Sequence, residues 1–237
     1  FVPPSPGDSG ASIGAGYFGY LNSIENTNSQ KQTSNNLFPG NFSQDTKFMD
    51  EIFNKLCGKN DLIDEIIKLL LKDEILATCF GNIETGPRSL GNRSLICNAA
   101  NNELVKRLSI DVKGRDEYVP VAPSMLIETA KKFYELKDNI HQCYYSMSAT
   151  AQLKSNFKDF KFKSIVHSDN TSRIQICNEK TLIGKILSNS NKKLEILANT
   201  SFNFSNDPVS YSYEDSILAM KKMNVDYLIT DSGIYKI

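Results

Sequence analysis

The feature that most constrains the fold of this chain is an apolar run that leads straight into a glycine-rich loop. Residues 74–80 read Glu-Ile-Leu-Ala-Thr-Cys-Phe, a pattern typical of a buried strand, and Gly81 then turns the chain toward the loop 85–94. A ligand-binding loop at the end of a strand is the usual arrangement in α/β folds. We therefore expect a sheet that contains this strand and carries the loop at one end.

Helical and strand patterns alternate on both sides of this run. Small residues or amphipathic patterns predict helices at 11–20, 46–57, 61–71, 98–108, 124–136 and 212–223. Strands are expected around 173–176 and at 194–198, and the arms of a hairpin at 226–230 and 234–237. This alternation indicates an α/β or α+β domain with a mixed sheet. The Asn/Ser/Gln-rich stretch 22–43 is expected to be a linker.

The loop 85–94 has the composition of an anion site. Gly86 and Gly91 let backbone N–H groups approach a ligand, and Pro87 stiffens the entry to the turn. Arg88 and Arg93 together could hold a phosphate or carboxylate through paired hydrogen bonds. The alternative is a tight surface turn with two solvated arginines. No Gly-Lys-Ser/Thr follows the glycines, so the loop is not a Walker P-loop.

Polar residues later in the chain are candidates for the same site. Lys113 and Arg115 flank Gly114, and in a strand both side chains would point to one face; a solvated basic edge is the alternative. Arg173 lies in an apparent strand, where it either forms a structural salt bridge or binds an anion. The amides and hydroxyls of 199–203, at the end of another strand, either bind a ligand or cap a turn.

Composition excludes several classes of protein. The 27 Lys and Arg residues balance 27 Asp and Glu residues, and this zero net charge argues against a nucleic-acid binder. The Lys- and Phe-rich stretch 152–163 reads as an edge strand, with stacking on single-stranded nucleic acid as the alternative. Five scattered cysteines without a CxxC pair suggest free thiols in a reducing compartment. No apolar run reaches the roughly 18 residues of a membrane span, so we expect a cytoplasmic protein.

Four blocks of residues, taken in order, carry a family resemblance. The loop 85–94 is followed by Val-Lys-Gly-Arg at 112–115, Val-Ala-Pro-Ser at 121–124 and Asn-Thr-Ser-Phe-Asn at 199–203. Together they resemble the C-terminal half of the ATP-dependent O-carbamoyltransferases, which modify nodulation factors and antibiotics. The resemblance implies a YrdC-like domain at 44–237, with a twisted mixed sheet flanked by helices. It also implies that 1–43 are the tail of an actin-like ATPase-fold domain and a linker.

The resemblance assigns roles to individual residues. Lys113, Asn199 and Ser201 match family residues that bind the carbamoyl nucleotide, and the block around Arg173 favours an anion ligand there. With Arg88 and Arg115, these residues are the expected substrate- and nucleotide-binding set. Arg88, Lys113 and Arg173 are the expected catalytic residues, because activation of carbamate holds several phosphate charges close together. Arg93 is expected to be structural.

Two positions complicate this assignment. Asp8, in a Gly-Asp-x-Gly turn, reads from pattern alone as a helix cap, but it matches the family aspartate that ligates iron(II). The family's histidine ligands lie upstream of the residues present here, so this metal site is expected to be incomplete. Val119 stands where the family has an arginine, and that difference removes a charge-assisted hydrogen bond worth about 1.5–3 kcal/mol.

The resemblance implies an activity and its partners. The expected domain binds ATP and carbamoyl phosphate and forms carbamoyl adenylate, for transfer to a hydroxyl group of a sugar or natural product. The expected partners are small-molecule substrates and an actin-like N-terminal domain in the same or another chain, with no nucleic acid and no membrane. Because the first residue is Phe1 rather than Met, we expect part of a longer protein. Three alternatives remain: threonylcarbamoyl-adenylate synthesis, a half-enzyme that needs a separate chain, and a degenerate nucleotide-binding or scaffolding module.

Overall fold

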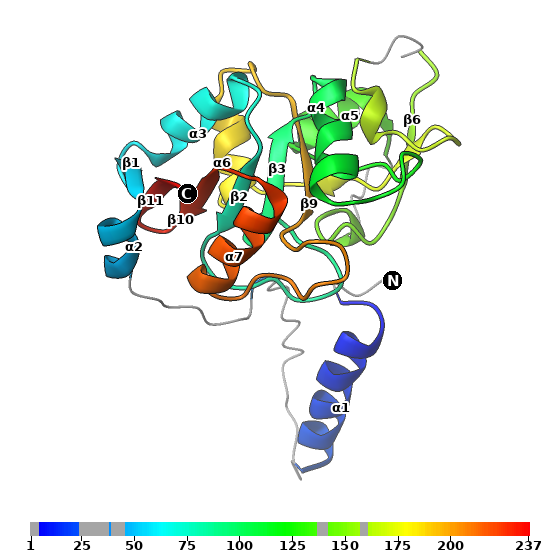
Figure 1. The fold of residues 1–237 in the computed structure, drawn as a ribbon. Helices are drawn as coiled ribbons and strands as arrows, with labels where there is room; N and C mark the ends of the chain where they lie inside the picture. The colour runs from blue at the N-terminus through cyan, green and yellow to red at the C-terminus, as the bar shows by residue number, and fades with distance from the viewer. Residues whose placement is uncertain (1–4, 24–37, 39–45, 137–141, 157–160) are drawn as a thin grey trace.

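A mixed sheet organises the domain. The computed structural model describes residues 5–23, 38, 46–136, 142–156 and 161–237. Within them an eight-stranded sheet has the order β1-β11-β10-β2-β3-β9-β4-β8, and a separate three-stranded sheet has the order β5-β6-β7 (Figure 1). Strands β10 and β2 pair in parallel, as do β4 and β8, and the other neighbours are antiparallel.

The strands are short, and their bounds are as follows. The large sheet contains β1 (Asn54–Gly58), β2 (Leu76–Cys79), β3 (Ser94–Asn98), β4 (Ala122–Met125), β8 (Gln175–Ile176), β9 (Ile196–Ser201), β10 (Tyr227–Thr230) and β11 (Gly233–Lys236). The small sheet contains β5 (Tyr134–Glu135), β6 (Ala151–Leu153) and β7 (Thr171–Ser172).

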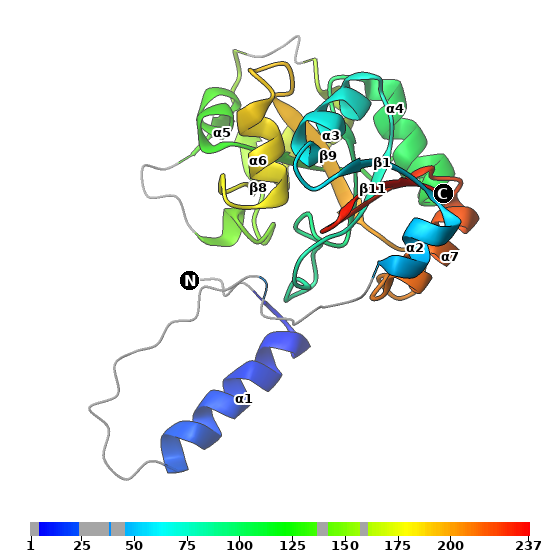
Figure 2. The same cartoon turned by 90° about the vertical axis from the view of Figure 1, so that its left-hand side faces the viewer.

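Helices cover both faces of the large sheet. Figure 2 shows α3 (Leu62–Leu71) and α6 (Leu182–Asn189) on the side of the sheet away from α4 (Asn102–Arg107) and α7 (Tyr213–Met223). Helix α5 (Ile127–Phe133) contributes to the same core as α4 and α7. The remaining helices are α1 (Asp8–Ser23), α2 (Lys47–Ile52), the π-helical turn η1 (Leu108–Val112) and the 3-10 turns η2 (Gln142–Tyr144) and η3 (Lys163–Ile165).

The core has two layers because strand side chains alternate between faces. In β3, Leu95 and Cys97 join the cluster under α4 and α7, whereas Ile96 joins the cluster under α3 and α6. Strand β9 follows the same alternation. Both faces of the central strands are buried, which confirms the predicted mixed sheet with helices on its two sides.

Several predicted elements are confirmed. The run 74–80 contains the fully buried strand β2, and 61–71 contains α3. Helix α7 begins at a capping box in which the Ser212 hydroxyl accepts from the N–H of Asp215 and the Asp215 carboxylate accepts from the N–H of Ser212, each at 3.1 Å. The predicted hairpin is β10 and β11. Within α7, however, the apolar side chain of Leu218 is 68% exposed and does not join the core.

Three predicted helices are wrong at one or both ends, because part of each pattern pairs in a sheet instead. The prediction 46–57 contains α2 and then β1, which pairs with β11. The prediction 98–108 begins inside β3. The prediction 124–136 begins inside β4 and ends in β5, which pairs with β6. In all three cases cross-strand hydrogen bonds to distant segments outweigh a local helical preference.

The strand geometry considered for 113–115 is not found. These residues close a helical turn, because Gly114 N–H donates to Ile110 O at 2.9 Å and Arg115 N–H donates to Ser109 O at 3.0 Å. Of the edge strand predicted at 152–163, β6 accounts for the beginning, and residues 157–160 lie outside the described residues.

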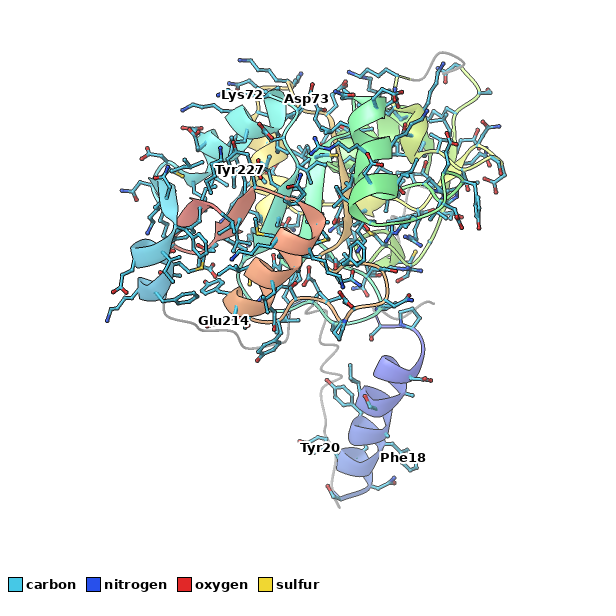
Figure 3. The ribbon with its side chains drawn as sticks, in the orientation of Figure 1. Phe18, Tyr20, Lys72, Asp73, Glu214 and Tyr227 are labelled. Carbon is cyan, nitrogen blue, oxygen red and sulfur yellow. The ribbon has the colours of Figure 1, made fainter. Side chains whose placement is uncertain are left out.

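Helix α1 confirms the prediction at 11–20 and projects from the domain (Figure 1). Figure 3 shows Phe18 and Tyr20 on this helix, away from the body of the domain, and their side chains are 71% and 61% exposed. The linker predicted at 22–43 lies almost wholly outside the described residues. Among the helices that the structure describes, none combines the length and the hydropathy that a membrane crossing requires.

Candidate functional site

One end of the large sheet carries the predicted site residues. The pairing directions bring the carboxyl ends of β2 and β9 together with the amino ends of β3, β4 and β8. The loop that carries Arg88 joins β2 to β3, Lys113 follows η1, and Arg173 directly precedes β8. Asn199 and Ser201 lie in the last part of β9 and point to the same face because they are two residues apart.

The loop between β2 and β3 is held by the carboxylate of Glu84. One oxygen, Oε1, accepts from the N–H groups of Leu90, Asn92 and Arg93 at 2.9, 2.8 and 3.0 Å. The N–H of Gly91 donates to Ser94 Oγ at 3.0 Å. These four N–H groups are therefore satisfied within the protein, whereas the sequence pattern had suggested that glycines here expose N–H groups to a ligand.

The two arginines of the loop have different environments. Arg93 is 1% exposed, and its Nη1 donates to the carbonyl oxygens of Phe80, Gly81 and Asn92 at 3.0, 3.3 and 3.0 Å. Arg88 is exposed and lines a pocket. The structure therefore excludes both a joint grip by two arginines and a turn with two solvated arginines: Arg93 is structural, and only Arg88 faces solvent.

Gly91 is the loop position least able to accept a side chain. Its φ is +119°, and a Cβ atom there would lie 2.9 Å from Cδ1 and Cγ1 of Ile183 in α6. We expect Gly91→Ala to lower the free energy of unfolding by about 1–3 kcal/mol, from backbone strain and overpacking. The matched control is Gly16→Ala in α1, where an added Cβ atom would meet nothing within 4 Å among the described residues outside the helix's own backbone, and where alanine favours the helix. Urea denaturation of both variants checks this, and an unchanged midpoint for Gly91→Ala would contradict it.

Three guanidinium groups gather at this end of the sheet. Burial, and then the charge of Arg88, lower the pKa of Arg115. Burial, and then Arg88 and Arg115, lower the pKa of Arg173 to about 10. Within the described residues none of the three is in an ion pair with a carboxylate. Like charges without a counter-charge repel one another, so this cluster favours an anionic ligand.

A pocket opens beside two of these arginines. Its volume is about 490 Å³, within the usual range for small-molecule sites. Arg88 and Arg173 supply its positive charge, and it is also lined by Pro6, Pro87, Met147, Ser148, Ala149 and Thr150. The Nε atom of Arg173 is buried and has no hydrogen-bond partner among the described residues. An anion in the pocket would therefore meet two guanidiniums and two hydroxyl groups.

Lys113 lies next to this cluster, and its amine is hydrogen-bonded to Ser201 and Asn203. It is 2% exposed, and its Nζ donates to Ser201 O at 2.9 Å, to Asn203 Oδ1 at 2.7 Å and to the carbonyl oxygen of Asn203. Burial, and then the charge of Arg115, lower the pKa of Lys113 to about 7. Ser201 Oγ lies 3.4 Å from the same Nζ atom. Lys113 and Ser201 are thus brought together as predicted, although not on the strand face that the pattern suggested.

Asn199 belongs to a buried polar row beneath the loop. Its Nδ2 donates to Gln175 Oε1 at 2.9 Å and to Ser89 O at 3.3 Å. Gln175 Nε2 donates to Leu90 O at 2.8 Å, and Ser124 Oγ donates to Gln175 Oε1 at 2.5 Å. Since carbonyl oxygens only accept, these contacts fix the orientation of both amides. Asn199 Oδ1 is left buried and without a partner among the described residues.

The structure gives no support for a metal at Asp8. This residue is exposed and forms the first turn of α1. No group of three or more His, Cys, Asp or Glu side chains in the described part of the chain is arranged to hold a metal ion. The residues present therefore do not fit an iron site, and no step of the chemistry below is assigned to iron.

Val119 supplies no positive charge, and both of its backbone polar groups are hydrogen-bonded within the protein. The valine N–H donates to Asp116 O at 3.0 Å, and its carbonyl oxygen accepts from Ser109 Oγ at 3.1 Å. Arg115, four residues earlier, belongs to the guanidinium cluster.

Two residues that organise the site, Glu84 and Gln175, were not among the predicted candidates, and a third, Asn203, was predicted only as part of the polar block 199–203. Glu84 lies only four residues before Arg88, and a carboxylate inside a glycine-rich loop is the signal that could have identified it. Gln175 lies two residues after Arg173 and Asn203 ends the block 199–203, but nothing local shows which distant groups they contact.

Solved structures share the fold. Full-length HypF, in a phosphate- and nucleotide-bound form, superposes with a TM-score of 0.54 at 19% identity, over 72% of this chain and 21% of that one. HypF of T. kodakarensis gives a TM-score of 0.53 at 22% identity, over 71% of this chain and 20% of that one. At this level of identity the likeness shows the fold alone, and it confirms the predicted YrdC-like architecture.

Sequence relatives identify the family. Nodulation protein NolO of Bradyrhizobium diazoefficiens is 31% identical over 174 residues, which are 72% of this chain and 31% of that protein. A 3'-hydroxymethylcephem-O-carbamoyltransferase of Streptomyces clavuligerus is 30% identical over 143 residues, 58% of this chain and 26% of that protein. The chain thus spans less than a third of the length of these two relatives. The family described as carbamoyltransferase C-terminus matches residues 67–236, so this chain belongs to the carbamoyltransferase C-terminal family.

Proposed function

We propose that this chain is the part of an O-carbamoyltransferase that binds ATP and carbamoyl phosphate and forms carbamoyl adenylate. Residues 44–237 are its YrdC-like domain, and 1–43 are the tail of an actin-like domain and a linker. The carbamoyl group then passes to a hydroxyl group of a small acceptor such as a sugar or natural product, with the help of an actin-like domain in the same or another chain. The names of the relatives support the carbamoyl group as the one transferred.

The observation that carries this proposal is the cluster of Arg88, Arg115 and Arg173. It holds three positive charges at the end of the sheet, and no carboxylate among the described residues is paired with them. Both proposed substrates carry phosphate groups, so their binding supplies the missing counter-charge. A structural salt bridge at Arg173 was the alternative, and no such pair occurs within the described residues.

The chemistry needs cations where negative charge develops. Formation of a carbamoyl adenylate from these substrates requires that water first cleaves the P–O bond of carbamoyl phosphate, which releases inorganic phosphate and carbamate. A carbamate oxygen then bonds to the α-phosphorus of ATP, and the bond from that phosphorus to the departing pyrophosphate breaks. Arg88 and Arg173 in the pocket, with Arg115 and Lys113 beside them, stabilise the charge on the phosphate oxygens. Asn199 Oδ1, which is left without a donor, and Ser201 orient the carbamoyl or nucleotide group.

Calorimetric titration of the chain with ATP and with carbamoyl phosphate tests the proposal. We expect both to bind, and we expect Arg88→Ala to weaken carbamoyl phosphate about tenfold or more, because a charge-assisted hydrogen bond is lost. Lys113→Ala is expected to weaken binding as well. Arg107→Ala is the matched control, because Arg107 is an exposed arginine of α4 outside the cluster. This variant should bind ATP and carbamoyl phosphate as well as the unaltered chain does.

The outcomes separate the readings of the chain. If neither compound binds, a catalytic role for the isolated chain is wrong. If both bind equally well to Arg88→Ala and to the unaltered chain, the pocket beside Arg88 is not the site. Val119→Arg adds a further comparison: little gain in affinity is expected, because Arg88, Arg115 and Arg173 already supply three cations at the site. A large gain would instead support a chain that has lost part of its site.

A further inference from the structure

Glu84 is the acidic side chain at the centre of the ligand loop, and no role in the proposed chemistry requires it. Its Oε1 atom receives three backbone N–H groups, from Leu90, Asn92 and Arg93, at 2.8 to 3.0 Å. Successive N–H groups that converge on one point form a concave anion-binding nest. Here the nest is already filled by a carboxylate from the same loop.

The hydrogen bonds of Glu84 also determine where Arg88 lies. They join residue 84 to residue 90, so the chain between them is a closed ring with Arg88 near its far side. Behind this ring, Leu90 O accepts from Gln175 and Ser89 O accepts from Asn199. Leu90 itself is 1% exposed. Because the base of the ring is held on both sides, Arg88 is directed outward into the pocket that it shares with Arg173.

From these contacts we infer that Glu84 is the positioning residue of the ligand loop, with two effects on the proposed substrate site. Its carboxylate holds the ring that aims Arg88 at the phosphate group of the ligand. It also occupies the N–H groups that would otherwise attract phosphate, so the phosphate is bound by the guanidiniums in the pocket and not by the backbone. The inference rests on the proposed function for the identity of the ligand, but not for the nest itself.

The two effects lead to different results when Glu84 is changed. In Glu84→Ala the nest is empty and the ring is released, so the affinity for carbamoyl phosphate falls about tenfold or more. Formate is small enough to replace the missing carboxylate and can accept the same N–H groups. Formate is therefore expected to raise the melting temperature of Glu84→Ala and to restore much of its affinity for carbamoyl phosphate.

The experiment uses the full 237-residue chain and two readouts. Thermal melts with and without formate test whether the three N–H groups bind a carboxylate. Calorimetric titration with carbamoyl phosphate, with and without formate, tests whether Glu84 positions Arg88 for the ligand. Glu84→Gln is the second variant, for use if the alanine variant is too unstable, because its amide oxygen keeps one acceptor and preserves the fold. We expect this variant to bind carbamoyl phosphate several-fold more weakly than the unaltered chain and to respond little to formate. Glu117→Ala is the control, because the side chain of Glu117 is 76% exposed.

Each result decides a separate point. Formate should stabilise Glu84→Ala but not the unaltered chain or Glu117→Ala. If it stabilises all three alike or none, the nest is wrong. If formate restores stability to Glu84→Ala but not affinity, Glu84 is structural and does not position Arg88. If the unaltered chain does not bind carbamoyl phosphate while the formate response of Glu84→Ala is present, the proposed substrate fails and the nest stands.

Discussion

Replacing Arg93 with methionine is expected to lower the free energy of unfolding by about 3–5 kcal/mol. The guanidinium is buried, and its Nη1 donates to three carbonyl oxygens that end β2 and precede β3. Loss of the guanidinium removes this donor from the carbonyl oxygens of Phe80 and Gly81, whereas Asn92 O still accepts from the N–H of Phe80. Loss of such buried, charge-assisted hydrogen bonds typically costs several kcal/mol. Against a total stability of about 5–15 kcal/mol, this is a large effect. Chemical denaturation monitored by circular dichroism measures it.

Arg107→Met provides the matched control for this loss. Arg107 is exposed on α4, and a surface arginine changes stability by about 0.5 kcal/mol or less. Equal stability of the two variants would mean that the buried guanidinium adds nothing to the fold. Binding distinguishes Arg93 from Arg88: at temperatures where Arg93→Met remains folded, its affinity for carbamoyl phosphate should fall less than that of Arg88→Ala, because Arg93 does not line the pocket.

Binding of carbamoyl phosphate is expected to weaken as the pH rises from about 7 to about 9, by at most about tenfold per pH unit. Burial lowers the pKa of Lys113 to about 7, so the amine is increasingly neutral above that pH in the free protein. An anionic ligand favours the charged amine, so binding at higher pH must be accompanied by uptake of a proton. Titrations in two buffers with different heats of ionisation would measure that uptake directly.

The same lysine gives stability the opposite dependence on pH in the absence of ligand. Its pKa is about 7 in the folded chain and 10.5 as the ordinary value. Between these values the unfolded chain binds more protons than the folded chain, so stability rises with pH, by at most about 1.4 kcal/mol per pH unit. Lys113→Met should remove both this rise and the pH-dependent loss of binding. If both dependences persist in Lys113→Met, another group is responsible.

The local sequence pattern was sufficient to predict the elements whose apolar residues recur at the spacing of a buried strand or an amphipathic helix. Strand β2 is an uninterrupted apolar run, and α3 has apolar residues on one face. Strand β1 gave no such signal, because most of its residues are exposed and it is a strand through its pairing with β11. Strand β4 contains Pro123, which argues against a strand in any pattern that ignores its neighbours.

The site was predicted in its residue types but not in its contacts. The family-like blocks identified Arg88, Lys113 and Arg173 as cations, and the structure gathers them at one end of the sheet. Pattern could not show that Lys113 donates to Ser201, which is 88 residues later in the chain, or that Arg93 turns inward. Those contacts depend on how β9 and β3 pair, and pairing between distant strands leaves no local trace in the sequence.

The position of the β10–β11 hairpin has a consequence for how the chain acquires its structure during synthesis. These two strands are the last of the large sheet to leave the ribosome, yet they fill the gap between β1 and β2, which emerge among the first. Until then β1 and one edge of β2 have no partner, and open strand edges pair readily with other chains. The Asp231 carboxylate, at the tip of the hairpin, also accepts from the N–H of Gly81 at 2.8 Å, where the ligand loop begins. A nascent chain therefore lacks this contact of its ligand loop until residue 231 has been made.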